Sequence, residues 1–376
     1  MSGRPGWAAG LRWEAAARSA GLNARLRWLT TIREDPRGPA VLHLSLGHGT
    51  SQDDVAKSAD LLAAAFKSAR VEVVADRLRA DRCSVVLHRT HVPDPVMYPE
   101  AFKVAPRRLP RSHLEPLPLG LDSVGGVVTV PLFDRTSGAT SLLLSGVPGS
   151  GKSMGLRVVL AGLAPTATAV VVIDPTGGAE ASLWSPRLGE VVLSAEAAPT
   201  LELLHSVLSL IVRRGELLGA GAPLSLLSPL VLVIDELAEL AAAGTPKQQE
   251  EARSALRRVV ALGRKVNVAA VLASQRVTST TVDVTTRSLV GWRLALAHPD
   301  DVHGSEALLG PGRKEAARLT KADVGAGYLT NGGAPTLLRV FHLPTSDVPD
   351  LAHSGVAMDL DSLHQWDEAA LCELSR

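Results

Sequence analysis

Apolar and polar residues in the larger, later part of the chain follow two periodicities, one typical of buried strands and one typical of helices. Short, mostly apolar runs predict strands at 141–145, 169–173, 230–234, 267–273 and 289–296. Helical spacing of apolar residues predicts helices at 154–163, 200–218 and 246–262. Because strands that alternate with helices form parallel sheets, we expect an α/β domain with a mostly parallel sheet and helices on both faces. A hairpin, 327–330 with 336–341, is expected to close this domain.

A smaller α/β module is predicted before this domain. Its pattern predicts strands at 41–46, 71–74 and 84–87 and a helix at 53–67. Further upstream, the segment 7–33 places Trp and Leu residues at roughly helical spacing, with arginines on the polar face. Three interpretations of this segment stay open: a helix on a membrane surface, a helix packed on its own protein or a neighbouring subunit, or an unstructured leader.

Prolines recur every few residues between His91 and Pro118, and they forbid a helix or a central strand there. We therefore expect a semi-rigid linker. The predicted organisation is an N-terminal Arg/Trp-rich helical segment, a small α/β module, a Pro-rich linker, the main α/β domain and a short acidic tail, at 1–38, 39–91, 92–118, 119–345 and 346–376.

Composition narrows the class of protein only slightly. The net charge of +1 by itself favours neither a nucleic-acid binder nor an acid-seeking surface. Arginine outnumbers lysine 31 to 8, which suits a phosphate-rich partner or reflects a biased genome composition. Cys83 and Cys372 lie far apart without metal-binding spacing, which indicates a reducing cytosol. No membrane span or signal peptide is predicted, so we expect a cytoplasmic protein, free or peripheral at the inner face of the membrane.

The run between the strand at 141–145 and the helix at 154–163 has the pattern G-x-x-x-x-G-K-S. This is the phosphate-binding P-loop, in which glycines let backbone N–H groups point at phosphate oxygens and the helix N-terminus adds positive charge. The predicted cofactors are ATP and Mg²⁺, with Lys152 at the β- and γ-phosphates and Ser153 on Mg²⁺. The predicted nucleotide-binding residues are Gly146, Val147, Pro148, Gly149, Ser150, Gly151, Lys152, Ser153 and Met154.

Two acids follow the apolar strand at 230–234. In a P-loop protein such a strand lies beside the P-loop strand, so Asp235 is predicted to orient Mg²⁺ or its waters. Glu236 is predicted to polarise the attacking water, since a water nucleophile needs a nearby base. Gln275, at the end of the strand at 267–273, is predicted to contact the γ-phosphate or the water.

These motifs, in this order, resemble the FtsK/SpoIIIE family of hexameric DNA translocases, and most of all its conjugative-transfer branch, the TraB-like and TraSA-like proteins of actinobacterial mobile elements. The resemblance covers about 119–343. It is carried by residues 146–153, 172–175, 212–218, 231–240, 263–276 and 319–327.

The resemblance implies a RecA-like, ATP-hydrolysing P-loop motor that moves double-stranded DNA for transfer of a plasmid or integrative element. It implies a ring homo-oligomer, a hexamer, with ATP between subunits and an arginine supplied by the neighbour; Arg213 and Arg214 match the family's paired arginines by position. DNA would be held through its phosphates. Candidate DNA contacts are Arg276, Thr278, Thr280, Thr281 and Arg287. A membrane or transfer-machinery partner is also expected.

The sequence departs from that family at one informative position. Where the conjugative branch has Asp-Pro-Lys-Gly-Gly, this chain has Thr176 in place of the lysine, so one basic contact is missing.

Two other functions stay open. A type VII-like secretion ATPase shares this motor and moves folded protein, although such proteins carry several tandem motors and membrane anchors. A non-motor P-loop nucleotide-binding protein or small-molecule kinase is the second, and a stable monomer in all nucleotide states would favour it.

Overall fold

The computed structural model describes residues 7–31, 40–68, 70–76, 78–88, 93, 95–98, 110–278 and 281–374. The chain divides into two compact units, Met1–Pro93 with Ser123–Gly125, and Asp94–Asp122 with Gly126–Arg376. Among the helices in these described ranges, none combines the length and apolar character needed to cross a bilayer.

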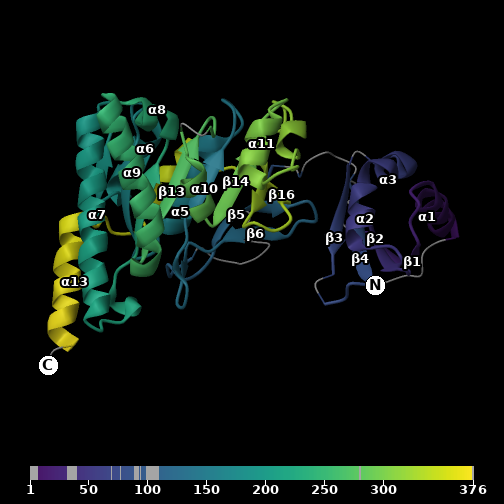
Figure 1. The fold of residues 1–376 in the computed structure, drawn as a ribbon, viewed down its shortest axis with the longest axis horizontal. Helices are drawn as coiled ribbons and strands as arrows, with labels where there is room; N and C mark the ends of the chain where they lie inside the picture. The colour runs from purple at the N-terminus through teal and green to yellow at the C-terminus, as the bar shows by residue number, and fades with distance from the viewer. Residues whose placement is uncertain are drawn as a thin grey trace. The chain divides into compact units, whose positions relative to one another are not determined.

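The first unit is a four-stranded antiparallel sheet with its helices packed on one face (Figure 1). The strand order is β1-β2-β4-β3. Its core contains Trp13 from a helix and Leu42, Leu44 and Val85 from the strands. In chain order the elements are α1 (Trp7–Ser19), β1 (Ala24–Thr31), β2 (Ala40–Leu46), α2 (Gln52–Lys57), α3 (Ala59–Phe66), β3 (Arg70–Ala75) and β4 (Arg82–His88).

The helix expected over 7–33 is wrong beyond residue 19, because the later half of that segment is strand β1. Leu26 and Leu29 pack against the core, whereas Arg25 and Arg27 are exposed, so alternation governs this stretch. A bulge between Leu26 and Trp28 interrupts the alternation. Trp13 is buried in the first unit, so α1 packs against its own protein.

The second unit is built on a ten-stranded sheet, ordered β11-β10-β12-β13-β9-β14-β15-β16-β5-β6. The pairs from β11 to β14 are parallel and those from β14 to β6 are antiparallel. The strands are β5 (Leu117–Asp122), β6 (Val127–Val130), β9 (Leu142–Ser145), β10 (Ala169–Ile173), β11 (Glu190–Val192), β12 (Leu230–Ile234), β13 (Val268–Ser274), β14 (Trp292–Leu296), β15 (Ala326–Thr330) and β16 (Thr336–Val340). A separate short pair is formed by β7 (Phe133–Asp134) and β8 (Gly138–Ala139).

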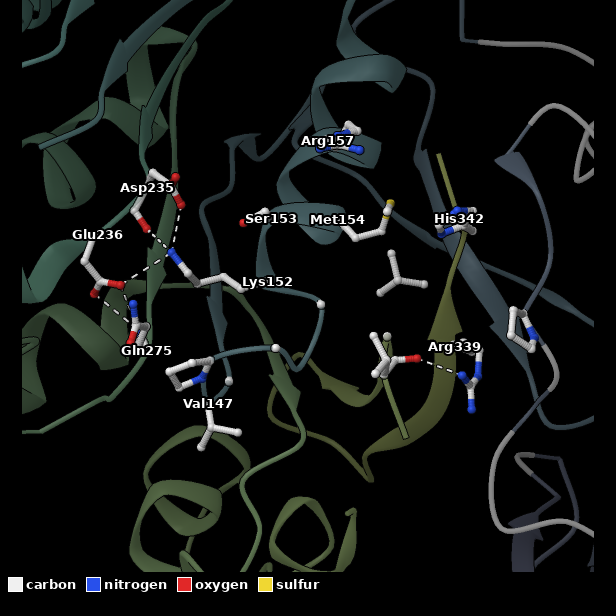
Figure 2. Close-up of a pocket in the computed structure, with 18 of the residues that line it drawn as sticks. Val147, Lys152, Ser153, Met154, Arg157, Asp235, Glu236, Gln275, Arg339 and His342 are labelled. Atoms are coloured by element: carbon white, nitrogen blue, oxygen red, sulfur yellow. Dashed lines mark hydrogen bonds and ion pairs between the residues drawn. The ribbon is translucent and has the colours of Figure 1, made fainter. Parts of the chain in front are cut away.

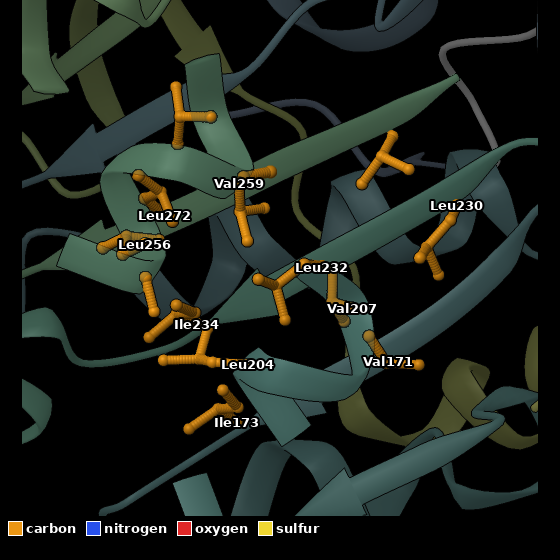
Figure 3. Close-up of a cluster of buried hydrophobic side chains, with 14 of the residues drawn as sticks. Val171, Ile173, Leu204, Val207, Leu230, Leu232, Ile234, Leu256, Val259 and Leu272 are labelled. Carbon is orange, nitrogen blue, oxygen red and sulfur yellow. The ribbon is translucent and has the colours of Figure 1, made fainter. Parts of the chain in front are cut away.

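Helices cover both faces of this sheet. They are α5 (Lys152–Leu163), α6 (Ala179–Leu183), α7 (Ala197–Gly219), α8 (Leu237–Ala242), α9 (Pro246–Gly263), α10 (Val284–Leu289), α11 (Val302–Leu309), α12 (Val348–Ala352) and α13 (Leu360–Leu374). On one face Leu232 and Ile234 pack against Leu204 of α7 and Val259 of α9 (Figure 3). On the other face Val231 and Val233 belong to the core cluster that contains α5 and α12. The predicted α/β fold class, a mostly parallel sheet between helical layers, is confirmed.

The antiparallel end of the sheet differs from the expectation. The hairpin β15–β16 does not close the domain, because β5 and β6, which precede the P-loop in the chain, add two further strands. The proline-rich stretch is not a solvated linker throughout its described part. Tyr98 is buried against Phe341, and Leu117 begins β5. Pro118 is tolerated in β5 because the strand is bulged there.

The region after residue 345, expected as a short acidic tail, folds into α12 and α13, and α13 packs along α7 (Figure 1). The contact contains a buried ion pair in which Arg214 Nε lies 2.7 Å from Asp367 Oδ2, with side chains 0% and 1% exposed. Arg214 also donates to the Val266 carbonyl at 3.1 Å. The neighbouring Arg213 and Glu368, 46% and 63% exposed, meet at 3.6 Å.

These adjacent pairs give a matched test of burial. Asp367→Ala leaves the Arg214 guanidinium buried without its counter-ion, so the free energy of unfolding should fall by about 3–5 kcal/mol. Glu368→Ala removes an exposed partner and should cost less than about 1 kcal/mol. Urea titration followed by tryptophan fluorescence measures both. Equal midpoints for the two variants would contradict the structural role of the pair.

Candidate functional site

The P-loop connects β9 to α5 at the carboxyl edge of the parallel strands. Gly149 and Gly151 have φ angles of +81° and +104°, in the left-handed region that favours glycine. A Cβ atom at position 151 would also lie 2.9 Å from the Gly325 backbone. The loop therefore keeps its shape only with glycine at these two positions, and Gly151 caps the N-terminus of α5.

Two neighbouring segments hold the P-loop from both ends. At its start, Val147 N donates to the Ala297 carbonyl at 3.2 Å, and the Ser145 hydroxyl lies 3.2 Å from His298 Nε2. At its end, Gly325 N donates to the Ser150 carbonyl at 2.8 Å. The backbone of the loop is thus fixed by residues that come well over a hundred positions later in the chain.

His298 is a residue that the sequence patterns did not reveal. It is buried, and burial lowers the pKa of its ring below the ordinary value, so it is neutral near pH 7. Its Nδ1 lies 2.8 Å from the Leu296 carbonyl, which can only accept a hydrogen bond. Nδ1 therefore carries the proton, and Nε2 accepts from the Ser145 hydroxyl just before the P-loop.

Lys152, Asp235 and Glu236 form a lysine–carboxylate centre beside the P-loop (Figure 2). The Lys152 ammonium lies 2.8 Å from Asp235 Oδ1 and 3.4 Å from Glu236 Oε2, and it donates to the Asp235 carbonyl at 2.7 Å. All three side chains are largely buried. One cation therefore faces two carboxylates. The expectation that β12 lies directly beside the P-loop strand β9 is wrong, because β13 lies between them.

The Asp235 carboxylate is in surroundings that favour a cation. Burial raises its pKa above the ordinary value, and the nearby carboxylates of Asp174 and Glu236 raise it further, whereas the Lys152 ammonium lowers it. A positive charge near Asp235 offsets the cost of this buried negative charge. Ser153, at the start of α5, lines the same cavity, so a serine hydroxyl and a carboxylate, the oxygen ligands that Mg²⁺ prefers, are available here.

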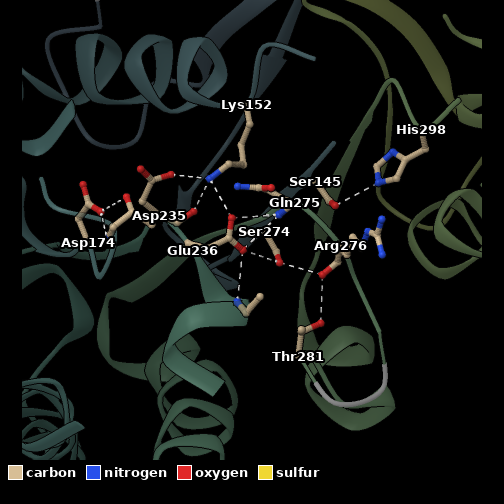
Figure 4. A network of polar contacts seen from close by, with 12 residues as sticks. Ser145, Lys152, Asp174, Asp235, Glu236, Ser274, Gln275, Arg276, Thr281 and His298 are labelled. Atoms are coloured by element: carbon tan, nitrogen blue, oxygen red, sulfur yellow. Dashed lines mark hydrogen bonds and ion pairs between the residues drawn. The ribbon is translucent and has the colours of Figure 1, made fainter. Parts of the chain in front are cut away.

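Glu236 is held from several sides. It accepts hydrogen bonds from the Ser274 hydroxyl at 2.9 Å, from Gln275 N at 3.2 Å and from Ala238 N at 3.3 Å (Figure 4). The contacts from Ser274 and Gln275 follow from the parallel register of β12 and β13, which pairs Ile234 with Leu272 and so brings the two strand ends together. The contact from Ala238 is local, because Glu236 caps the N-terminus of α8. The carboxylate has one fixed orientation beside Lys152.

A cavity of about 670 Å³ extends from this centre along the P-loop. That volume is within the range of small-ligand sites. Beyond Lys152 its wall is formed by Met154, Arg157, Arg339 and His342 (Figure 2), with Pro95 and Val324 from other segments. Arg157 is fixed by Glu180 at 2.6 Å and by the Leu343 carbonyl at 2.9 Å. Of these lining residues, only Met154 was predicted.

Thr176, which stands where the resemblance expects lysine, also lines the cavity. Its hydroxyl donates to Asp174 Oδ1 at 2.7 Å, and its backbone N–H donates to the same oxygen at 2.9 Å (Figure 4). Thr176 thus fixes the turn after β10 instead of presenting a positive charge.

The structure brings the predicted P-loop residues other than Ser150, together with Asp235, Glu236 and Gln275, to one cavity, whereas Ser150 is buried. It does not bring the two arginines of α7 there. Arg214 contacts Val266, just before β13 begins, so it lies toward the opposite edge of the sheet. Because Arg214 is buried against Asp367, the expectation that it reaches a neighbouring subunit is wrong; Arg213 is half-exposed and stays a candidate.

Some of the hydroxyl groups in the predicted DNA-contact loop after β13 form hydrogen bonds within the loop. The Thr281 hydroxyl donates to the Arg276 carbonyl at 3.1 Å, and Thr278 N donates to the Thr281 hydroxyl at 2.9 Å. Arg276 is exposed and Arg287 is half-buried. Thr280 lies outside the described residues. Arg276 is therefore better placed for an external contact than Thr281 or Arg287, which are both half-buried.

Comparison with known proteins finds similarity of fold. No family model matches the chain, and no curated protein does. The conjugation coupling protein TcpA of pCW3, in its monomer form with ATPγS, aligns with a TM-score of 0.60 at 15% identity, over 91% of this chain and 99% of that one. The cytoplasmic domain of the Thermomonospora curvata type VII secretion ATPase EccC aligns with a TM-score of 0.58 at 22% identity, over 71% and 36%.

A third structure, EssC (ATPases 2 and 3) from Geobacillus thermodenitrificans, aligns with a TM-score of 0.55 at 11% identity, over 75% of this chain and 53% of that one. This chain therefore spans about a third of the EccC chain and about half of the EssC chain. The resemblance to FtsK/SpoIIIE-type conjugative proteins is confirmed as a likeness of fold. Fold and site together are those of a P-loop nucleotide-binding domain.

Ser274 gives a test of how Glu236 is oriented. Ser274→Ala removes the donor to Glu236 while leaving Lys152 and the P-loop unchanged, so kcat for ATP hydrolysis should fall about 10- to 100-fold with little change in KM. The matched control is Ser206→Ala, a half-exposed serine on α7 whose hydroxyl donates to the Glu202 carbonyl. Steady-state kinetics measures both. An unchanged kcat in the Ser274 variant would show that this hydrogen bond does not orient the carboxylate.

Proposed function

We propose that this chain is an ATP-hydrolysing motor that translocates double-stranded DNA, in conjugative transfer of a plasmid or integrative element. The observation that carries the proposal is the lysine–carboxylate centre beside the P-loop, with Lys152 between Asp235 and Glu236 at 2.8 and 3.4 Å. A P-loop, a lysine and two strand-end acids in this arrangement suit phosphoryl transfer from a nucleoside triphosphate.

ATP would bind with its phosphates on the P-loop and its nucleoside along Met154, Arg157 and His342. Lys152 has a flexible stem, so its ammonium can exchange Asp235 for the β- and γ-phosphates. Ser153 and Asp235 would hold Mg²⁺, which when bound neutralises charge on the phosphates.

Hydrolysis needs a water positioned opposite the leaving oxygen and a group that takes its proton. Glu236 supplies that group, because three donors fix its carboxylate beside Lys152. The Gln275 side chain lies at the same cavity and would orient the water. As the oxygen of water bonds to the γ-phosphorus, the bond to the β-phosphate oxygen breaks, leaving ADP and phosphate.

DNA is the favoured cargo because the structural alignments differ in how much of each similar protein they cover. The conjugation coupling protein matches over nearly the whole length of both chains, whereas the secretion ATPases match over only part of their own length. The loop after β13 offers Arg276, and α10 offers Arg287, for contact with phosphates of a duplex.

Ser274 would couple this loop to the site. Its hydroxyl lies 2.9 Å from Glu236 and 2.8 Å from the Arg276 carbonyl, yet it has one proton to donate (Figure 4). A movement of the loop at Arg276 changes which acceptor the proton serves. DNA contact could thereby alter the orientation of the catalytic carboxylate.

The motor would act as a ring homo-oligomer, a hexamer, with an arginine from the neighbouring subunit completing each site. Arg213 is the remaining candidate on α7, since it is half-exposed and its contacts with Glu216 and Glu368 are 3.6 Å long. A membrane or transfer-machinery partner would place the ring at the inner face of the membrane.

Two substitutions separate binding from turnover. Glu236→Gln keeps the side-chain shape but cannot accept the proton of water, so turnover should fall by about 10²- to 10⁴-fold while ATP stays bound. Lys152→Ala should lose both turnover and ATP affinity. Steady-state hydrolysis and binding of a fluorescent ATP analogue distinguish them. Equal loss of binding in the two variants would contradict the assigned roles.

The proposal for the cargo is tested by ATP hydrolysis with and without a long duplex, alongside sizing of the complex with ATPγS. Duplex DNA should raise kcat severalfold and ATPγS should favour the ring. If no DNA changes the rate, the translocase proposal fails. Stimulation by a secretion-substrate peptide alone would favour the type VII-like function, and a monomer in every nucleotide state would favour a non-motor protein.

A further inference from the structure

Among the described residues, the helices of the first unit pack on one face of its sheet, and the opposite face is open except near Val86, which is 2% exposed. Leu42, Leu44 and Leu46 of β2 point into the core, so His43 and Ser45 point to the opposite face. Strand register places two rows of side chains on that face. Arg25, Ser45 and Arg82 form one row, and Trp28, His43, Ser84 and Val74 form the other. We call these residues, with Arg27, the outer sheet face.

One of the three arginines on this face, Arg82, is near an acid, because the pKa of Asp81 is lowered by its hydrogen bond with Arg79 and also by the charge of Arg82. Within the described part of the chain, no ion pair involves Arg25, Arg27 or Arg82. Arg27, at the bulge, is held over the Trp28 ring at 4.8 Å, and Trp28 in turn stacks on His43 at 4.8 Å. The aromatic contact fixes the Arg27 guanidinium but leaves its N–H groups available.

A hollow of about 280 Å³ lies between these groups. It is lined by Arg27, Trp28, His43, Arg82 and Ser84, with Asp76 among the remaining lining residues. Asp76 uses one carboxylate oxygen to accept from the backbone of Leu78 and Arg79, at 2.9 and 3.2 Å, so this acid is engaged in its own turn. The Arg27 guanidinium is held over Trp28, and the Ser84 hydroxyl lies 3.0 Å from His43 Nδ1. These groups, with the Arg82 guanidinium, suit an anionic ligand rich in oxygen.

Charge is also distributed unevenly between the two units. Residues 1–93 contain 14 Lys and Arg against 9 Asp and Glu, whereas residues 94–376 contain 25 against 29. The near-neutral net charge of the whole chain is thus the sum of a basic first unit and a slightly acidic remainder. A polyanion is therefore drawn to the first unit.

We infer that the outer sheet face binds the phosphate backbone of double-stranded DNA, as a contact separate from the loop after β13. The inference rests on the proposed function, which supplies DNA as the polyanion. Arg25 is on β1 and Arg82 on β4, with β2 between them, so their backbones lie about 10 Å apart. The row can therefore contact more than one phosphate. Because Trp28 already carries Arg27 and His43, the face suits phosphate contact instead of base stacking.

The experiment measures binding of the full chain to a fluorescently labelled 40-base-pair duplex by anisotropy over a range of salt. The test variant is Arg27→Gln/Arg82→Gln. The matched control is Arg12→Gln/Arg18→Gln, which removes two exposed arginines from α1, on the other side of the sheet. Thermal unfolding and DNA-free ATP hydrolysis verify that every variant is folded, since none of these arginines lines the nucleotide cavity.

The test variant should bind the duplex about tenfold more weakly than the wild type, and its slope of log affinity against log salt should be smaller by about 1.8, for two lost phosphate contacts. The slope of the control variant should differ from the wild-type slope by less than about half of the change expected for the test variant. Equal affinities for the test and control variants would overturn the inference, as would a wild-type chain that does not bind the duplex. Binding of anionic lipid vesicles that depends on Arg27 and Arg82, without DNA binding, would overturn it in favour of a membrane contact.

The two proposals can fail separately. If the test variant keeps wild-type DNA binding and DNA-stimulated hydrolysis, the outer sheet face is not a DNA site and the translocase function stands. If the wild type binds duplex through Arg27 and Arg82 but duplex leaves its hydrolysis rate unchanged, the surface stands and the motor function fails.

Discussion

The contact between the Lys152 ammonium and two buried carboxylates is the constraint around which the second unit is organised. Asp235 and Glu236 repel each other unless a cation lies between them, and burial strengthens that repulsion. The lysine comes from the strand–loop–helix at β9 and the acids from the end of β12. Parallel pairing with β13 between those two strands is what brings the groups within 2.8 and 3.4 Å.

The same edge of the sheet carries the groups that keep this contact in place. Ser274 and Gln275 at the end of β13 hold Glu236, and Ala297, His298 and Gly325 hold the P-loop. Each holding group lies at a strand end or in a loop beside one. Core packing fixes the positions of the strand ends. The loops that connect the strands can therefore differ in length without moving the lysine–carboxylate centre.

The sequence was sufficient to predict that Lys152, Asp235 and Glu236 share one site, and to predict the central strands of the second unit and three of its helices. A P-loop and an acid pair after an apolar run have local signatures, and strands buried on both faces are plainly apolar. The second half of 7–33 was misjudged because leucines at helical spacing coincide with the alternation of Arg25, Leu26 and Arg27, and a bulge breaks that alternation. The burial of Arg214 could not be predicted, because its partner lies 153 residues later.

That long separation also bears on how the protein is made. During translation, α7 leaves the ribosome long before Asp367 is synthesised. Until Asp367 is present, the Arg214 guanidinium has no counter-ion to offset the cost of burying it in the core. The parallel strands can pair at that stage, but the packing of α7 against them is weakened by the unpaired charge of Arg214. Nascent chains of this protein should therefore depend on chaperones for an extended interval, and proteases should find α7 vulnerable until synthesis reaches α13.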